Sequence, residues 1–149
     1  MKRILLYVGA LLLLFQRGRG RDIGSLRPVE LVQLTERNGV LILETDTGDR
    51  GWGLTVEEAV AKLKQTTPGW IYLDTASFLL IEEGVEQYLP AIQPYLKRET
   101  MMAYAAESVD LTWAAEYLRI HKPSQTIGKC EKPQEKLILE GEKINLKIF

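Results

Sequence analysis

Two stretches of the chain place apolar residues at helical spacing. The first holds Val56, Ala59, Val60 and Leu63, and the second holds Leu111, Ala114, Ala115 and Leu118. Residues at this spacing share one face of a helix, and that face must be buried against another element. Thr55 and Glu58 form a capping box, in which the threonine hydroxyl accepts a hydrogen bond from the Glu58 amide and the carboxylate reaches back. The pattern therefore predicts one helix that begins near Thr55 and a later helix capped by Ser108 or Asp110.

Shorter apolar runs predict strands around these helices. They occupy residues 29–35, 40–45, 70–73, 77–81 and 101–106. The pair Asn38-Gly39 lies between the first two runs and tolerates positive φ, which favours a hairpin. Apolar residues alternate again over residues 137–148, which predicts a second hairpin. We therefore expect an α+β fold, with a mixed or antiparallel sheet, N- and C-terminal hairpins, and three to four helices packed on the sheet.

Prolines interrupt a third helical pattern, in residues 85–96. Pro90 and Pro94 cannot sit inside one uninterrupted helix, because each proline removes a backbone hydrogen bond. We expect two short helices or one kinked helix here, with Pro90 near the start of the second part.

The N-terminal 25 residues have the pattern of a signal-like membrane anchor followed by a basic stalk. Lys2 and Arg3 precede twelve consecutive apolar residues at positions 4–15, and three arginines and three glycines follow at positions 17–24. A run of this length suits the apolar part of an export signal and is shorter than the roughly 20 residues that span a bilayer. We expect an uncleaved or inefficiently cleaved anchor in residues 1–25 and a single α+β domain in residues 26–149, outside the cytoplasm.

The charge of the chain changes along its length. The five charged residues within positions 1–21 are all basic, which leaves 14 basic and 20 acidic residues in the remainder. An acidic body argues against a nucleic-acid partner, because neutralising phosphates needs a concentrated basic face. The single cysteine, Cys130, excludes an intramolecular disulfide, and the single histidine, His121, excludes a site with two imidazoles.

A glycine-rich loop precedes the first helix and carries the candidate contact residues Asp49, Arg50 and Trp52. Its glycines do not have the spacing of a phosphate-binding or dinucleotide-binding loop. We therefore expect a turn whose glycines allow tight entry into the helix, with Trp52 packing as a hydrophobic staple. The alternative is a small-ligand-binding or enzymatic domain that uses the loop from Gly48 to Gly53. Exposure of Arg50 and Trp52 around a pocket would favour this alternative.

No residue is expected to be catalytic, to bind a cofactor or to bind a metal. Glu82 and Glu83 are adjacent, so they do not face each other, and we expect them to complement the dipole at the start of a helix. His121 follows a predicted helix and is interpreted as a cation at its C-terminus. Cys130 lies among charged residues without a partner motif, which is typical of a surface cysteine. The sequence therefore predicts a protein that is not an enzyme.

Four motifs within residues 21–120 carry a family resemblance. They are Leu54-Thr55-Val56-Glu57-Glu58-Ala59, Ile71-Tyr72-Leu73-Asp74, Phe78-Leu79-Leu80-Ile81-Glu82-Glu83-Gly84-Val85 and Leu96-Lys97-Arg98-Glu99. One family has the same features in the same order. It has a helix start of the form T-x-x-E-A, then a strand that ends in an acidic pair, and then an Arg-Asp/Glu step before a short strand and helix. The chain resembles the N-terminal domain of that family, Ger(x)C, the C subunits of spore germination receptors.

The resemblance implies a membrane-associated, extracytoplasmic protein of a spore-forming bacterium, which works by binding partner proteins and not by catalysis. Membrane receptor subunits are the partners that it implies. Members of the family are anchored through a lipobox cysteine, and residues 11–21 contain no cysteine. In this chain the apolar run at positions 4–15 would therefore be the anchor.

Overall fold

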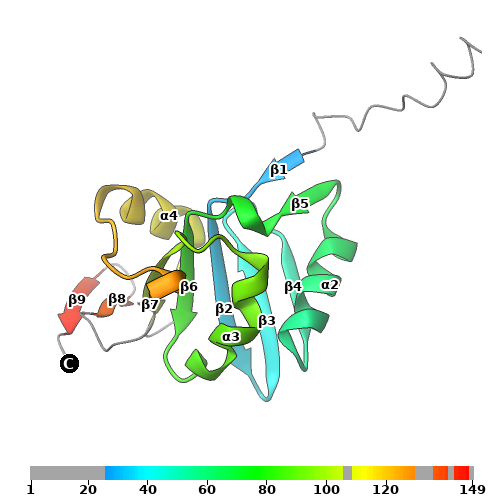
Figure 1. Cartoon of the computed structure of the whole chain (residues 1–149), viewed down its shortest axis with the longest axis horizontal. Helices are drawn as coiled ribbons and strands as arrows, with labels where there is room; N and C mark the ends of the chain where they lie inside the picture. Colours follow the sequence, from blue (N-terminus) through cyan, green and yellow to red (C-terminus); the bar gives the residue numbers. More distant parts are fainter. Residues whose placement is uncertain (1–25, 106–108, 130–135, 141–142, 148–149) are drawn as a thin grey trace, which may run out of the picture.

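A seven-stranded mixed sheet organises the part of the chain that the computed structural model describes, residues 26–105, 109–129, 136–140 and 143–147 (Figure 1). Its strand order is β4-β3-β2-β6-β7-β8-β9. These strands are β2 (Leu31–Arg37), β3 (Val40–Thr45), β4 (Arg50–Gly53), β6 (Phe78–Glu82), β7 (Met101–Ala105), β8 (Lys136–Glu140) and β9 (Lys143–Lys147). A separate two-stranded sheet pairs β1 (Leu26–Pro28) with β5 (Trp70–Tyr72).

Helices cover both faces of the sheet. Within the described residues they are α2 (Val56–Thr66), α3 (Leu89–Ile92) and α4 (Leu111–Ile120), with 3-10 turns η2 (Leu73–Thr75), η3 (Glu86–Tyr88), η4 (Gln93–Tyr95) and η5 (Ile127–Lys129). α2 and α3 pack on one face, in a core that includes Leu34, Leu63 and Leu79. α4 packs on the other face, against Leu80 and Ala103. Leu79 and Leu80 enter different cores because neighbouring residues of β6 point to opposite faces.

Strand pairing is antiparallel at both ends of the sheet and parallel in its centre. β2 and β3 form the expected hairpin, whose turn residues Asn38 and Gly39 have φ angles of 54° and 78°. β8 and β9 form the C-terminal hairpin, and β2, β6, β7 and β8 pair in parallel between the two. The predicted α+β fold with two hairpins is confirmed. Parallel neighbours need crossover connections, and these connections carry the helices to the two faces.

Both predicted helix starts are capped. The Glu58 amide donates to the Thr55 hydroxyl at 3.2 Å, and the Glu58 carboxylate accepts from the Leu54 amide at 2.8 Å, one residue before the cap. Asp110 caps α4 by accepting a hydrogen bond of 2.7 Å from a backbone amide in the first turn. Ser108, the other candidate cap, lies outside the described residues. These caps start the helices at the positions that the sequence predicts.

The proline-containing segment is divided into short turns, as expected. η3, α3 and η4 follow one another over residues 86–95, with Pro90 in the first turn of α3 and Pro94 in η4. A proline at the start of a turn removes no helical hydrogen bond, because the first amides have no partner within the helix. The segment still buries Ile92 in the core beneath α2.

Two local predictions are wrong. Residues 50–53 were expected in a loop and instead form β4, which pairs antiparallel with β3. Glu82 was expected at the start of a helix and instead ends β6, where its carboxylate accepts a hydrogen bond of 2.6 Å from Nη1 of Arg37 on β2. This hydrogen bond raises the pKa of Arg37 above the ordinary arginine value. Both differences arise from contacts between strands. Residues 50–53 pair with β3, and Glu82 binds Arg37, which lies 45 residues earlier on β2.

The predicted anchor, residues 1–25, and Cys130 lie outside the described residues. Among the residues that are described, no helix combines the length and the apolar character that crossing a bilayer requires. The division into an anchor and one domain therefore stays a prediction, and so does the surface position of Cys130.

Candidate functional site

Strand β4 lies directly on helix α2 and alternates glycine with large residues. A Cβ atom on Gly51 would lie 2.1 Å from a backbone carbonyl oxygen of α2, and one on Gly53 would lie 2.4 Å from a side-chain atom of α2. These distances leave no room for a side chain between the strand and the helix. Because successive residues of a strand point to opposite faces, Arg50 and Trp52 point away from α2. The glycines thus allow β4 and α2 to approach closely, whereas the sequence predicts that they allow a tight turn into the helix.

Arg50 and Trp52 are both exposed, and each has a polar neighbour. The Arg50 side chain is 54% exposed, and its Nε atom lies 3.2 Å from Oε1 of Glu44 on β3. Trp52 is 47% exposed, and Nζ of Lys62 lies 5.1 Å from the centroid of its ring. The prediction that Trp52 packs as a buried staple is therefore wrong. The cause is its place in β4, where only glycine fits on the side that faces the helix.

A small hollow lies on the same face of the sheet. Its volume is about 280 Å³, and it is lined by Gln33, Thr35, Arg37, Ile42, Glu44 and Arg50. The charged side chains in this lining carry both signs. The core beneath α4 contains no residue of β3 or β4, so α4 covers a different part of this face. Trp52 is the register partner of Ile42 but does not line the hollow.

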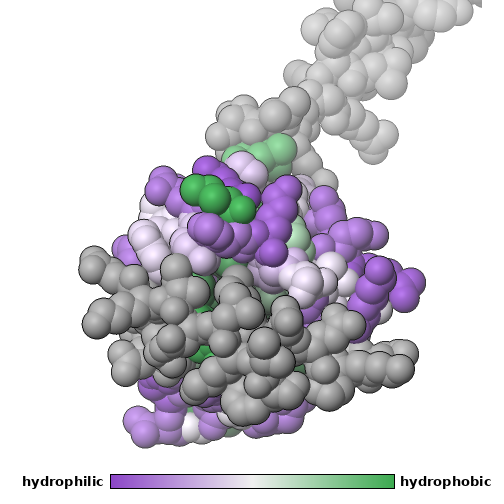
Figure 2. Space-filling view, turned by 90° about the vertical axis from the view of Figure 1, so that its left-hand side faces the viewer, coloured by the Kyte–Doolittle hydropathy of each residue, from purple (hydrophilic) through white to green (hydrophobic). Residues whose placement is uncertain are grey.

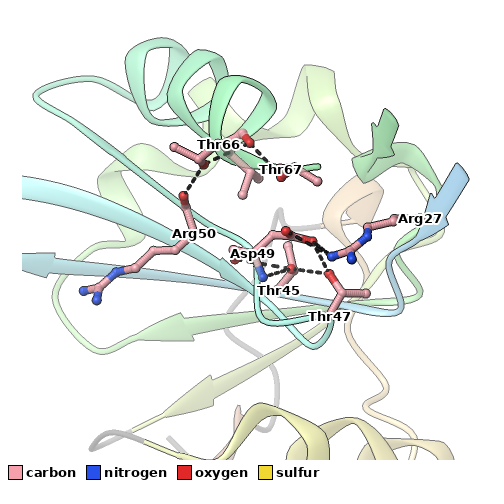
Figure 3. A network of polar contacts seen from close by, with 8 residues as sticks. Arg27, Thr45, Thr47, Asp49, Arg50, Thr66 and Thr67 are labelled. Atoms are coloured by element: carbon pink, nitrogen blue, oxygen red, sulfur yellow. Dashed lines mark hydrogen bonds and ion pairs between the residues drawn. The ribbon is translucent and has the colours of Figure 1, made fainter. Parts of the chain in front are cut away.

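Asp49 does not belong to this surface. Its side chain is 8% exposed and lies between two donors (Figure 3). Nη1 of Arg27 is 3.3 Å from both carboxylate oxygens, and the Thr47 hydroxyl donates at 2.7 Å. In Figure 3 the Arg50 side chain points away from this network, while its carbonyl accepts from the Thr66 hydroxyl at 2.8 Å. Asp49 therefore ties β1 to the β3–β4 turn, and the candidate contact residues separate into two groups.

A larger hollow lies beside β5. Its volume is about 540 Å³, and it is lined by Lys64, Gly69, Trp70, Ile71, Tyr72, Leu73, Asp74 and Tyr95. Nζ of Lys64 lies 5.9 Å from the centroid of the Tyr95 ring. The patterns considered in the sequence do not indicate this region. The available signal was the spacing of Trp70 and Tyr72, which puts two aromatic side chains on one side of a strand.

The α4 side of the molecule offers fewer candidate residues. His121 lies at the C-cap of α4, the position that the sequence gives it, and its ring stacks on Tyr117 with 4.3 Å between the centroids. Among the coloured residues on this side, Figure 2 shows mostly hydrophilic surface with a small hydrophobic area. Ile120, the last residue of α4, is 78% exposed. Across the described ranges, no group of three or more His, Cys, Asp or Glu side chains is placed to hold a metal ion.

Comparison of the chain with protein-family models, with curated proteins and with solved structures finds no match. Its function is therefore inferred from its own residues and their arrangement.

Proposed function

We propose that this chain is a membrane-anchored, extracytoplasmic protein-interaction module, related to the C subunits of spore germination receptors and acting without catalysis. The observation that carries the proposal is the outward display of Arg50 and Trp52 on an edge strand whose inner residues are glycines. Tryptophan and arginine are enriched among the residues that dominate binding at protein interfaces. An indole buries a large apolar area, and a guanidinium donates several hydrogen bonds in a fixed plane.

The charges around this pair also suit a protein partner. Arg50 and Glu44 are half exposed and of opposite sign, and Lys62 lies beside Trp52. Charged groups at the rim of an interface contribute to orientation and to the choice of partner more than to affinity. The surface therefore combines one large aromatic side chain with a charged rim of both signs.

The elements that carry the family resemblance support the relation to the C subunits. Thr55 caps α2, and the acidic residue Glu82 ends β6. Arg98 precedes β7, and α4 follows that strand. Thr55, Glu82 and Arg98 thus lie at or just before the boundary of a helix or strand, which is consistent with the resemblance.

The anchor is tested by fractionating the native host and treating intact cells or spores with protease. The full-length protein is expected to stay with the membrane after a high-salt wash, and its domain is expected to be cleaved from outside. Recovery in the soluble cytoplasmic fraction would contradict both the anchor and the role in germination.

The contact surface is tested by co-purifying receptor subunits with the tagged full-length protein. The double variant Arg50→Ala/Trp52→Ala should reduce recovery about ten-fold or more, since residues that dominate an interface cost about 2 kcal/mol or more each. Ile120→Ala is the control, because Ile120 is 78% exposed and is the last residue of α4, away from β4. Unchanged recovery with the double variant, or equal loss with the control, would contradict the assignment of this surface.

A second candidate function is a small-ligand-binding or enzymatic domain that uses the loop from Gly48 to Gly53. Arg50 is exposed and lines the 280 Å³ hollow together with Arg37, and an anionic ligand would bind there by replacing Glu44 and Glu82 as their partners. Trp52 does not line the hollow, so this function would depend on the arginines. Saturable thermal stabilisation by a small carboxylate or phosphate, lost in Arg50→Ala, would favour this second function over the first.

A further inference from the structure

The two-stranded sheet of β1 and β5 displays three large apolar side chains. Leu26 and Trp70 are register partners, and Tyr72 is the partner of Pro28. Leu26 is 39% exposed, Trp70 is 51% exposed and Tyr72 is 36% exposed. We call these three residues the aromatic ribbon. Figure 1 shows β1 and β5 side by side at one end of the molecule, outside the main sheet.

The exposure of the aromatic ribbon follows from the way β5 is held. Ile71 lies between Trp70 and Tyr72 and is buried in the core beneath α2. Alternation along the strand then turns the two aromatic side chains away from that core. Tryptophan and tyrosine combine a large apolar surface with one polar atom, and this combination is enriched where proteins meet the bilayer–water interface.

The position of the aromatic ribbon in the chain places it close to the proposed anchor. Eleven residue steps separate Phe15, the last residue of the apolar run, from Leu26. Such a segment reaches at most about 40 Å when fully extended. It contains Arg17, Arg19 and Arg21, and basic residues next to an anchor are attracted by anionic lipid headgroups. An anchor in residues 4–15 would therefore hold Leu26, the first residue of β1, within about 40 Å of the membrane surface.

The candidate contact surface extends away from this end. β4 begins at Arg50, next to Asp49, which binds Arg27 of β1. Trp52 lies three residues beyond Asp49, or about 10 Å along an extended strand. Trp52 is the register partner of Ile42, which lies near the turn of the β2–β3 hairpin. Trp70 is the register partner of Leu26, the first residue of β1, so Trp70 lies at the start of β1 and Trp52 lies farther from it.

We propose that the aromatic ribbon contacts the headgroup region of the phospholipid bilayer in which the chain is anchored, which leaves the surface of Arg50 and Trp52 available to a protein partner. The inference rests on the proposed membrane anchor and adds the face that the domain turns towards the lipid. Lys64 and Asp74 line the hollow beside the aromatic ribbon. Because their charges are opposite, they give this area no net attraction to charged headgroups, and the contact there comes from the aromatic side chains.

The test uses full-length protein reconstituted in phospholipid vesicles that carry a fluorescence quencher just below the headgroups. One variant, Trp52→Phe/Trp113→Phe, keeps Trp70 as its sole tryptophan, and its matched control, Trp70→Phe/Trp113→Phe, keeps Trp52. The two retained tryptophans are similarly exposed, at 51% and 47%. Binding to the vesicles should quench Trp70 and shift its emission to shorter wavelength, while the intensity and the wavelength of the Trp52 emission should not change.

Sedimentation of the same vesicles separates failure of this inference from failure of the anchor. Protein that sediments with the vesicles while Trp70 stays unquenched, or while both tryptophans are quenched equally, would overturn the inference and leave the anchor in place. Protein that stays in the supernatant would overturn the anchor and the inference with it. Hydrogen exchange on the unsubstituted protein repeats the test without mutation, with slower exchange expected over residues 70–72 and no change over residues 50–53 when vesicles are added.

Discussion

The close approach of β4 to α2 predicts that Gly51→Ala destabilises the protein strongly. The new Cβ atom would lie 2.1 Å from a carbonyl oxygen of α2 and 2.6 Å from Cβ of Leu63. Neither the strand nor the helix backbone can rotate away as a flexible side chain would. α2 must therefore move outward by a distance on the order of 1 Å to restore ordinary van der Waals contact.

The cost of this movement follows from what α2 buries. Val56, Val60 and Leu63 are at most 2% exposed, and burial of each such side chain contributes about 1.5 to 3 kcal/mol. A gap on the order of 1 Å removes roughly a quarter to a half of the dispersion attraction at that contact. We therefore expect Gly51→Ala to lower the free energy of unfolding by about 3 kcal/mol, which is a large part of the 5 to 15 kcal/mol typical of a domain.

The measurement is urea unfolding followed by far-UV circular dichroism, with Gly48→Ala as the matched control. Gly48 has a φ of +82°, and no atom lies within 4 Å of the position of an added Cβ. Its replacement should cost about 1 kcal/mol, from the left-handed backbone alone. A loss in Gly51→Ala that is no larger than the loss in Gly48→Ala would refute the direct contact between β4 and α2.

Three further substitutions test local features of the fold. Thr55→Ala should lower the free energy of unfolding by about 1 kcal/mol, because it removes the side-chain acceptor at the start of α2. Thr55→Ser keeps a hydroxyl at this position and should recover most of the loss in the same urea assay. Asp49→Ala should lower the free energy of unfolding by about 2 kcal/mol and lower the melting temperature, because it removes a nearly buried carboxylate that accepts hydrogen bonds from Arg27 and Thr47. An unchanged melting temperature would refute the structural role of Asp49. Glu82→Gln should cost about 0.5 kcal/mol, since Arg37 is half exposed. Glu82 raises the pKa of Arg37, so the stability from this pair is present below the ordinary arginine pKa and is lost only as the pH rises through the raised value. The loss in Glu82→Gln should therefore be equal at pH 7 and pH 9, and a smaller loss at pH 9 would contradict this assignment.

Much of the fold could be predicted from the sequence because the signals are local. The capping box at Thr55 and Glu58 and the turn at Asn38-Gly39 each involve residues within four positions of one another. The apolar spacing of the two main helices depends only on the helix period. Such features do not require knowledge of the neighbouring elements, so the two main helices, the hairpins and the α+β class could be identified.

The candidate site could be predicted only in part, because residues that are neighbours in the sequence differ in burial and in their partners. Asp49, Arg50 and Trp52 form one cluster along the chain. Arg27, 22 residues before Asp49, holds that carboxylate inside the β3–β4 turn, while strand alternation turns Arg50 and Trp52 to the surface. No local pattern indicates an ion pair over that separation.

What the sequence determined by itself is the two main helices, the two hairpins, their order and the positions of the helix caps and of the Asn38-Gly39 turn. Only the tertiary structure decided the parallel centre of the sheet, the strand formed by residues 50–53, and the pairing of Leu26 with Trp70. The physical reason is that the direction of a strand side chain depends on which element lies against each face and each edge. For β4 and β5 those elements are α2, β3 and β1, and their placement results from long-range packing that no local stretch of residues encodes.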